Sequence, residues 1–120
     1  QIEKRYRAIV AGDFSLLPNP FQVDQSIDGK IASSEFSFMQ LSTDGKLSLL
    51  DVSIATGRKH QIRRHLAGLG YPIVGDRLHG AAETNYSDLQ LTAYLLAFHC
   101  PIKNKPVEYR LPDEWMPDFS

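Results

Sequence analysis

Residues 56–80 read TGRKHQIRRHLAGLGYPIVGDRLHG, and this stretch decides the fold. Apolar side chains recur in it at the spacing of one helix face: Ile62, Leu66 and Leu69. Gly70 follows the last of them, where a helix commonly ends in a left-handed cap, and Pro72 prevents the helix from continuing. The pattern therefore predicts an amphipathic helix that begins near Thr56, followed by a structured loop that runs to Gly80.

The face of this helix opposite the apolar stripe is basic. At about 100° per residue, four residues fall on that side: His60, Arg63, Arg64 and Ala67. A start at Thr56 and Gly57 would leave free backbone N–H groups near Arg58 and Lys59, which is an arrangement that binds phosphate. The residues alone leave two interpretations open: a site that holds a few phosphates, or the solvated basic face of an ordinary amphipathic helix.

Strand-like patterns flank the helix. Four runs are predicted to form strands: residues 3–12, 35–41, 46–54 and 107–111. The turn signal Thr43-Asp44-Gly45 joins two of them in a hairpin, and residues 15–32 are expected to form an excursion outside the core. Residues 89–99 predict a short helical turn that leads into a buried strand. The chain is thus predicted to be one domain, residues 1–120, with an α+β fold in which one prominent helix packs a mostly antiparallel sheet.

The charge is distributed unevenly in a composition that is otherwise typical of a globular domain, with 42% hydrophobic residues. The net charge of −1 argues against a protein that binds nucleic acid by bulk charge. Four of the 13 Lys and Arg residues, however, fall between Arg58 and Arg64. A local basic patch on a nearly neutral domain is typical of a site that holds a few phosphates.

Sequence features of membrane and secreted proteins are missing from these residues. No apolar run approaches the roughly 20 residues of a membrane-spanning helix, and the first residues have no signal-peptide pattern. Cys100 is the single cysteine, so an internal disulfide is excluded. These observations predict a cytoplasmic protein with no membrane partner. The sequence also starts without Met in a strand-like run, which predicts that a longer domain begins upstream of Gln1.

A metal centre is not predicted. His60 and His65 stand about 140° apart around the helix, too far round to bind one ion. His79 and His99 have no cysteine or carboxylate at ligand spacing. Three further residues are interpreted as structural: Asp76 as a turn residue, Cys100 as a small buried side chain and Trp115 as a packing residue.

Three stretches of the chain resemble the RluA family of RNA pseudouridine synthases. Residues 56–80 carry the family's central motif, and Lys59 with the run Arg64-His65-Leu66 resembles the tRNA pseudouridine synthase C branch. Residues 4–12, KRYRAIVAG, resemble the family's tyrosine-bearing strand. The strand that ends in Phe98 before Pro101 resembles its closing segment. The resemblance covers nearly all of the chain except residues 13–34.

The resemblance implies a reaction and a role for each matching residue. Members of the family flip a uridine out of RNA; an aspartate attacks the nucleoside, the uracil detaches and rotates, and C5 replaces N1 on the ribose. Arg63 matches the arginine that pairs with this aspartate and keeps it ionised, and Tyr6 matches the tyrosine that packs against the target base. Four residues are expected to hold RNA phosphates and sugars: Arg58, Lys59, His60 and Arg64. No metal or organic cofactor is implied, and tRNA is the expected partner rather than rRNA.

The sequence departs from the family pattern at the nucleophile. The family's aspartate lies in a His-Arg-Leu-Asp motif upstream of the tyrosine strand, and these 120 residues contain no such motif. Thr92 stands where the family commonly has histidine, and His79 where many members have tyrosine. The chain is therefore identified as the C-terminal half of a catalytic domain, inactive without an N-terminal half that carries the aspartate. The alternative is a non-catalytic RNA-binding domain derived from such an enzyme.

Overall fold

A computed structural model describes residues 2–80, 88–100, 102 and 105–119, except for the side chains of residues 2 and 98–100. In this part of the chain six strands form one antiparallel sheet, in the order β2-β3-β4-β1-β5-β6. The elements are β1 (Ile2–Ala11), η1 (Phe14–Leu16), β2 (Phe21–Val23), β3 (Ser34–Leu41), β4 (Leu47–Ile54), α1 (Gln61–Leu69), β5 (Leu91–Cys100), β6 (Lys105–Arg110) and η3 (Asp113–Trp115). None of the helices in the described residues is long and apolar enough to cross a bilayer.

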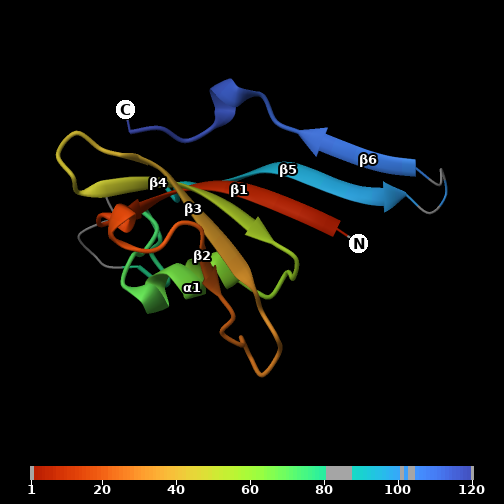
Figure 1. Ribbon diagram of the computed structural model, residues 1–120, viewed down its shortest axis with the longest axis horizontal. Coiled ribbons are helices and arrows are strands. Elements are labelled where there is room, and N and C mark those ends of the chain that lie inside the picture. Colours follow the sequence, from red (N-terminus) through yellow and green to blue (C-terminus); the bar gives the residue numbers. More distant parts are fainter. Residues whose placement is uncertain (1, 81–87, 101, 103–104, 120) are drawn as a thin grey trace.

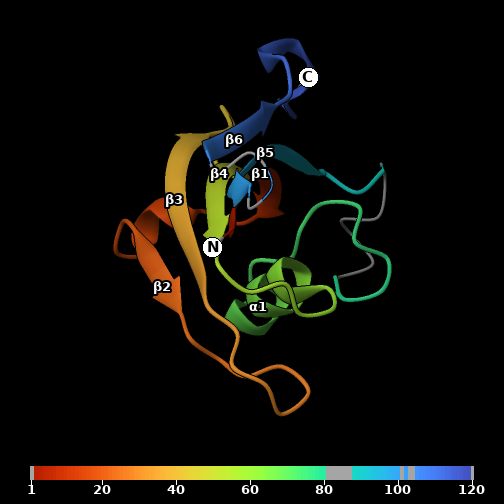
Figure 2. The same cartoon turned by 90° about the vertical axis from the view of Figure 1, so that its right-hand side faces the viewer.

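The core lies between α1 and one face of the sheet (Figures 1 and 2). Because strand side chains alternate between faces, Ala8 and Val10 of β1 point to the same side, and both are fully buried. Ile62 and Leu66 of α1 cover them, and Leu69 packs at the edge of this cluster. The predicted apolar stripe of the helix therefore anchors α1 to the sheet.

The other face of β1 carries two charged side chains, Arg5 and Arg7, beside the buried Ile9. Arg5 and Arg7 each donate to the carboxylate of Asp51 on β4, at 3.1 Å and 3.0 Å. Tyr94 of β5 also donates to Asp51, and the Arg7 guanidinium lies 4.7 Å from the centre of the Tyr94 ring. This alternation explains why one strand supplies both a core face and a polar face.

The loop after α1 is fixed to the sheet by backbone hydrogen bonds. Val74 donates to Ile9 over 2.9 Å, and Ala11 donates to Pro72 over 2.9 Å. Ile73 between them is fully buried. The predicted structured loop is therefore packed on β1. Figure 2 shows this loop as the green-to-teal trace that leaves α1.

Most of the predicted elements are confirmed. The hairpin around residues 43–45 joins β3 and β4, and the predicted strand at 107–111 corresponds to β6, which pairs with β5. The predicted end of the helix is also confirmed, because Gly70 has a φ of 87° and its N–H bonds to the last turn. The expectation for Cys100 lies outside the described side chains.

Four predictions about local structure are wrong. The helix begins at Gln61 instead of Thr56, because His60 has a left-handed φ of 53° that breaks the helical path before it. Residues 91–100 are strand throughout, since this run pairs with β1 on one side and β6 on the other. The excursion at 15–32 contributes β2 and three buried side chains to the core: Val23, Ile27 and Ala32. Trp115 does not pack on the domain, because 62% of it is exposed.

Candidate active site

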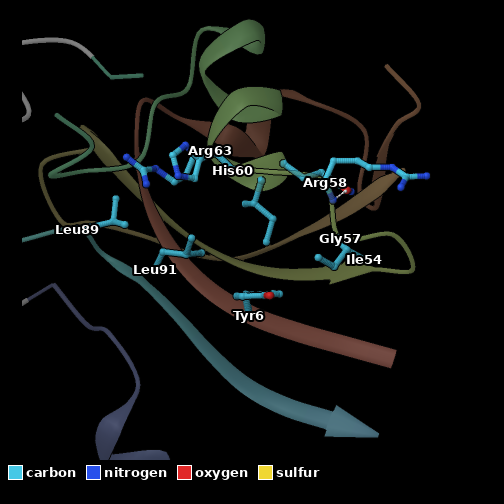
Figure 3. Close-up of a pocket in the computed structure, with 10 residues that line it drawn as sticks. Tyr6, Ile54, Gly57, Arg58, His60, Arg63, Leu89 and Leu91 are labelled. Atoms are coloured by element: carbon cyan, nitrogen blue, oxygen red, sulfur yellow. Dashed lines mark hydrogen bonds between the residues drawn. The ribbon is translucent and has the colours of Figure 1, made fainter. Parts of the chain in front are cut away.

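A pocket of about 260 Å³ opens between β1 and the start of α1. Its lining comes from β1, β4, the segment before α1, α1 itself and the start of β5: Tyr6, Ile54, Gly57, Arg58, His60, Gln61, Ile62, Arg63, Leu89 and Leu91. In Figure 3 the Tyr6 ring lies on the strand side of this pocket, and Arg63 and His60 lie on the helix side. The structure thus brings together two residues far apart in sequence, Tyr6 and Arg63, for which the family resemblance implies catalytic roles.

Tyr6 is held at the centre of the sheet. Its backbone pairs with Val52 of β4 on one side and with Ala93 of β5 on the other. The side chain is half-buried, and burial raises the pKa of its phenol because the charged form is poorly solvated there. At neutral pH Tyr6 therefore presents a neutral ring and a hydroxyl that can donate a hydrogen bond.

Arg63 forms a two-point ion pair with Asp76 in the loop after α1. Its Nε donates to Oδ2 of Asp76 over 3.1 Å, and its Nη2 donates to Oδ1 over 2.7 Å. The Asp76 side chain is fully buried, whereas 18% of the Arg63 side chain is exposed. Hydrogen bonding to Asp76 is the main reason why the pKa of the Arg63 guanidinium is raised. Arg63 is therefore a fixed cation on the wall of the pocket.

Asp76 is both the expected turn residue and the buried partner of Arg63. Its Oδ1 accepts backbone N–H groups from Leu78 at 3.2 Å and from His79 at 2.9 Å. Burial by itself raises the pKa of this carboxyl, but Arg63 and these N–H groups outweigh it, so the pKa lies below its usual value. No local pattern predicts this ion pair, because Arg63 belongs to α1 and Asp76 to the loop after it.

His60 stands at the mouth of the pocket and contacts a second histidine. Its Nδ1 lies 3.0 Å from Nε2 of His79, and the two rings are edge-to-face with centres 5.2 Å apart. Burial and the nearby Arg63 lower the pKa of His60. A neutral imidazole can donate or accept a hydrogen bond but adds no charge to an RNA contact. Among the described residues no three His, Cys, Asp or Glu side chains gather as potential metal ligands.

The other predicted RNA contacts lie outside the pocket or at its rim. Arg64 pairs with Asp28, and Lys59 is exposed; neither lines the pocket. Arg58 lines the pocket, but its side chain points away from Tyr6 in Figure 3, and its Nε donates to the carbonyl of Ile31 over 2.8 Å. These cations therefore form an outer patch, made of Arg58, Lys59 and Arg64, beside the loop at residues 24–33.

The predicted backbone phosphate site at the helix start is wrong. Arg58 precedes α1, and its backbone N–H donates to Oε1 of Gln61 over 3.2 Å. The same oxygen accepts the hydroxyl of Thr56 over 2.6 Å. The Gln61 side chain thus binds the Arg58 N–H, which the sequence pattern alone leaves free for a phosphate.

Gln61 and His65 could not be identified from the sequence as residues that support the site, because polar residues on an amphipathic helix are usually exposed and these two are buried. The Gln61 amide donates to Ser34 Oγ over 2.9 Å and to the Ser33 carbonyl over 2.8 Å. His65 lies 2.8 Å from the carbonyl of Gln25 through Nε2, which must donate because a carbonyl only accepts. Its Nδ1 then accepts from Ser34 Oγ at 2.9 Å. This network joins α1 to β3 and the loop before it, and so holds the helix in place over the sheet.

Comparison with known proteins identifies the family of this fold. The sequence profile described as RNA pseudouridylate synthase matches residues 1–68. An uncharacterised RNA pseudouridine synthase of Aquifex aeolicus is 30% identical over 92% of this chain and 42% of its own length. The dual-specificity RNA pseudouridine synthase RluA of Salmonella typhimurium is 32% identical over 72% of this chain and 40% of its own length.

The fold is shared with a solved structure as well. Human RNA pseudouridylate synthase domain containing 1 superposes with a TM-score of 0.81 at 22% identity, over 97% of this chain and 56% of that one. The chain spans less than half the length of the two curated relatives described above. The match of the family profile to more than half of these residues shows that the chain belongs to the RNA pseudouridylate synthase family.

Proposed function

We propose that this chain is part of an enzyme that isomerises a uridine to pseudouridine in structured RNA, with tRNA as the substrate. The observation that carries the proposal is the meeting of Tyr6 and Arg63 in one pocket. The likeness of Lys59 and its neighbours to the tRNA pseudouridine synthase C branch supports tRNA over rRNA. The nucleophilic aspartate is supplied by an N-terminal half that carries the His-Arg-Leu-Asp motif.

The two sides of the pocket suit the two halves of the reaction. Tyr6, Ile54, Leu89 and Leu91 form a largely apolar wall, against which a flipped uracil ring can pack. Arg63 offers a fixed guanidinium to the carboxylate of the nucleophile, because only two of its N–H groups are used by Asp76. Since a water-poor site favours the protonated carboxyl, this cation keeps the aspartate ionised and able to attack the nucleoside. These residues do the work without a metal or an organic cofactor.

The outer patch of Arg58, Lys59 and Arg64 holds the RNA backbone in this proposal. Phosphate contacts position an RNA and carry no sequence information, so the patch orients the strand while the pocket receives the base. His60, whose pKa is lowered, contributes a hydrogen bond to phosphate or ribose instead of a charge. The single cysteine, Cys100, cannot form an internal disulfide and supports a cytoplasmic location.

A second candidate is an RNA-binding domain that has lost the chemistry. The observation that favours it is the lack of a His-Arg-Leu-Asp motif within these 120 residues. Reading the coding sequence upstream of Gln1 separates the two candidates at once. The motif in frame supports the enzyme, and its absence from the whole reading frame supports the binding domain.

The activity is tested by tritium release from RNA labelled at C5 of uridine, because isomerisation exchanges the C5 hydrogen. The complete protein is expected to release tritium from bulk tRNA, and residues 1–120 alone are expected to release none, since they lack the nucleophile. Release by residues 1–120 alone would show that the assignment of the missing aspartate is wrong. RNA binding without any release by the complete protein would leave the binding domain as the function.

A further inference from the structure

Asp76 is the only described acidic residue whose side chain is fully buried, and the reaction described above gives it no role. A buried carboxylate is costly unless every oxygen is paired, and here both oxygens are. Oδ2 accepts from Arg63, and Oδ1 accepts from Arg63, Leu78 and His79. Such a site is built to hold an ionised carboxylate in one orientation.

The loop that carries Asp76 is fixed independently of α1. Backbone bonds tie Val74 to Ile9, and Gln90 to Val74, so the loop is fastened to the sheet on two sides. Gly80 closes it: its N–H donates to the carbonyl of Asp76 over 2.9 Å, and a Cβ at Gly80 would lie 2.6 Å from that oxygen. The backbone that carries Asp76 is therefore held against β1, the strand that carries Tyr6.

The pairing also determines which part of Arg63 remains for another partner. A guanidinium has five N–H groups in a planar fork, and Asp76 takes Nε and one position of Nη2. The Nη1 end is not used in this pair, and Arg63 itself lines the pocket. A second carboxylate that enters the pocket can therefore bind the end of the fork while the first holds its side.

We propose that Asp76 is a positioning residue, which holds the Arg63 guanidinium so that its free end faces the nucleophilic carboxylate. The proposal rests on the proposed function and adds to it the group that sets the geometry. An arginine has four rotatable bonds and would otherwise sample many positions, whereas catalysis requires the donors to be in place before the reaction. A series of contacts, from β1 to the loop and from Asp76 of that loop to Arg63, fixes the distance between the guanidinium and Tyr6.

The test compares Asp76→Asn with Asp51→Asn in the complete protein. Both changes remove one carboxylate from an arginine ion pair at constant volume, but Asp51 lies on the other face of the sheet, outside the pocket. Asp76→Asn is expected to lower kcat by about 10- to 100-fold with KM for RNA within about twofold, because misplaced groups of this kind cost up to about 10²-fold. Asp51→Asn is expected to leave kcat near wild type.

A double-mutant cycle shows whether the effect passes through Arg63. If it does, Asp76→Asn adds little to Arg63→Lys, since the geometry that it protects is already lost. A full additional loss of kcat in the Arg63→Lys background would overturn the proposal. So would equal losses for Asp76→Asn and Asp51→Asn, or wild-type turnover in Asp76→Asn.

A measurement on the wild-type protein needs no variant and no activity. Nitrogen-15 relaxation of the arginine Nε–H groups is expected to show Arg63 as rigid as the backbone and Arg64, in its exposed pair, as mobile. Equal mobility of the two would overturn the proposal even if Asp76→Asn fails to fold. A rigid Arg63 in a protein without isomerase activity would refute the proposed function while leaving the positioning by Asp76 intact.

Discussion

The guanidinium of Arg64 donates two hydrogen bonds to the carboxylate of Asp28, at 3.1 Å and 3.2 Å. The pair joins α1 to the tip of the loop at residues 24–33, and 65% of the Asp28 side chain is exposed. Arg64, Lys59 and Lys30 together lower the pKa of Asp28. An RNA phosphate that binds Arg64 therefore has to compete with a carboxylate already present.

Removal of that competitor is expected to strengthen RNA binding. Asp28→Asn frees Arg64 and deletes one negative charge from the patch, so the Kd for tRNA should fall several-fold at low salt. The measurement is filter binding or fluorescence anisotropy at two salt concentrations. Asp44→Asn, in the turn between β3 and β4, is the matched control and should leave Kd unchanged. Weaker binding by Asp28→Asn would mean that the loop, and not the phosphate, is the functional partner of Arg64.

Neutralising the outer patch is expected to weaken binding without changing sequence preference. Each of Arg58→Ala, Lys59→Ala and Arg64→Ala should lower the slope of log K against log salt by about one unit or less. Lys59 is the most exposed of the three and should have the clearest effect on the slope. His60→Gln, measured beside them, should leave the slope unchanged because His60 is neutral. A triple alanine variant with the wild-type slope would show that the patch is only solvated.

Arg63 and Arg64 are neighbours with different expected roles in turnover. Arg63→Lys cannot reproduce the two-point contact with Asp76 or the free end of the fork, and should cut single-turnover rates by roughly 10²-fold or more, about 3 kcal/mol. Arg64→Lys keeps a charge near phosphate and should lose far less. Arg63→Lys should also lower the free energy of unfolding by about 1–3 kcal/mol, because Asp76 is left underpaired in the interior. Equal losses of turnover in both variants would contradict these roles.

Stability at low pH is expected to depend on Asp76. Its pKa is lowered in the folded protein, so the unfolded chain binds the proton more readily. The contribution is therefore complete above the unfolded pKa of about 3.9 and is lost as the pH falls through that value toward the folded pKa. Urea unfolding from pH 7 to pH 3 should show a stability gap between wild type and Asp76→Asn that narrows below about pH 4. A gap of constant size would show that the folded protein does not need the ionised form.

The elements whose pattern is local could be predicted from the sequence. Strand alternation gave β1 and the β3–β4 hairpin, and helical spacing gave the buried face with Ile62 and Leu66. The start of α1 could not be predicted, because it depends on the left-handed backbone of His60 and on the side chain of Gln61. The apolar run at residues 89–99 predicts a short helical turn before a strand, and only the pairing of β5 with two neighbouring strands makes residues 91–100 extended throughout.

For the site, residue types were easier to predict than contacts. The central motif placed Arg63 on the exposed side of the helix, and on that basis Arg63→Lys would be expected to leave folding intact. The structure adds a buried partner, Asp76, which changes that expectation. The partner of Arg64 was equally hidden, because Asp28 belongs to a stretch interpreted as an excursion. Contacts between elements depend on how the chain packs, and periodicity within one element contains no information about them.

The position of β1 between β4 and β5 has a consequence for how the protein adapts to its substrate. Tyr6 belongs to a strand that is hydrogen-bonded along both edges, so it cannot shift register unless two ladders break together. Tyr6 is therefore the stationary reference of the pocket. In the proposed reaction, nucleotides of different shape are accommodated by rotation of side chains on the opposite wall, which α1 and the segment before it form, such as His60, instead of by movement of the sheet. Variation among related enzymes that alters substrate choice should accordingly concentrate on that wall and spare the strand beneath it.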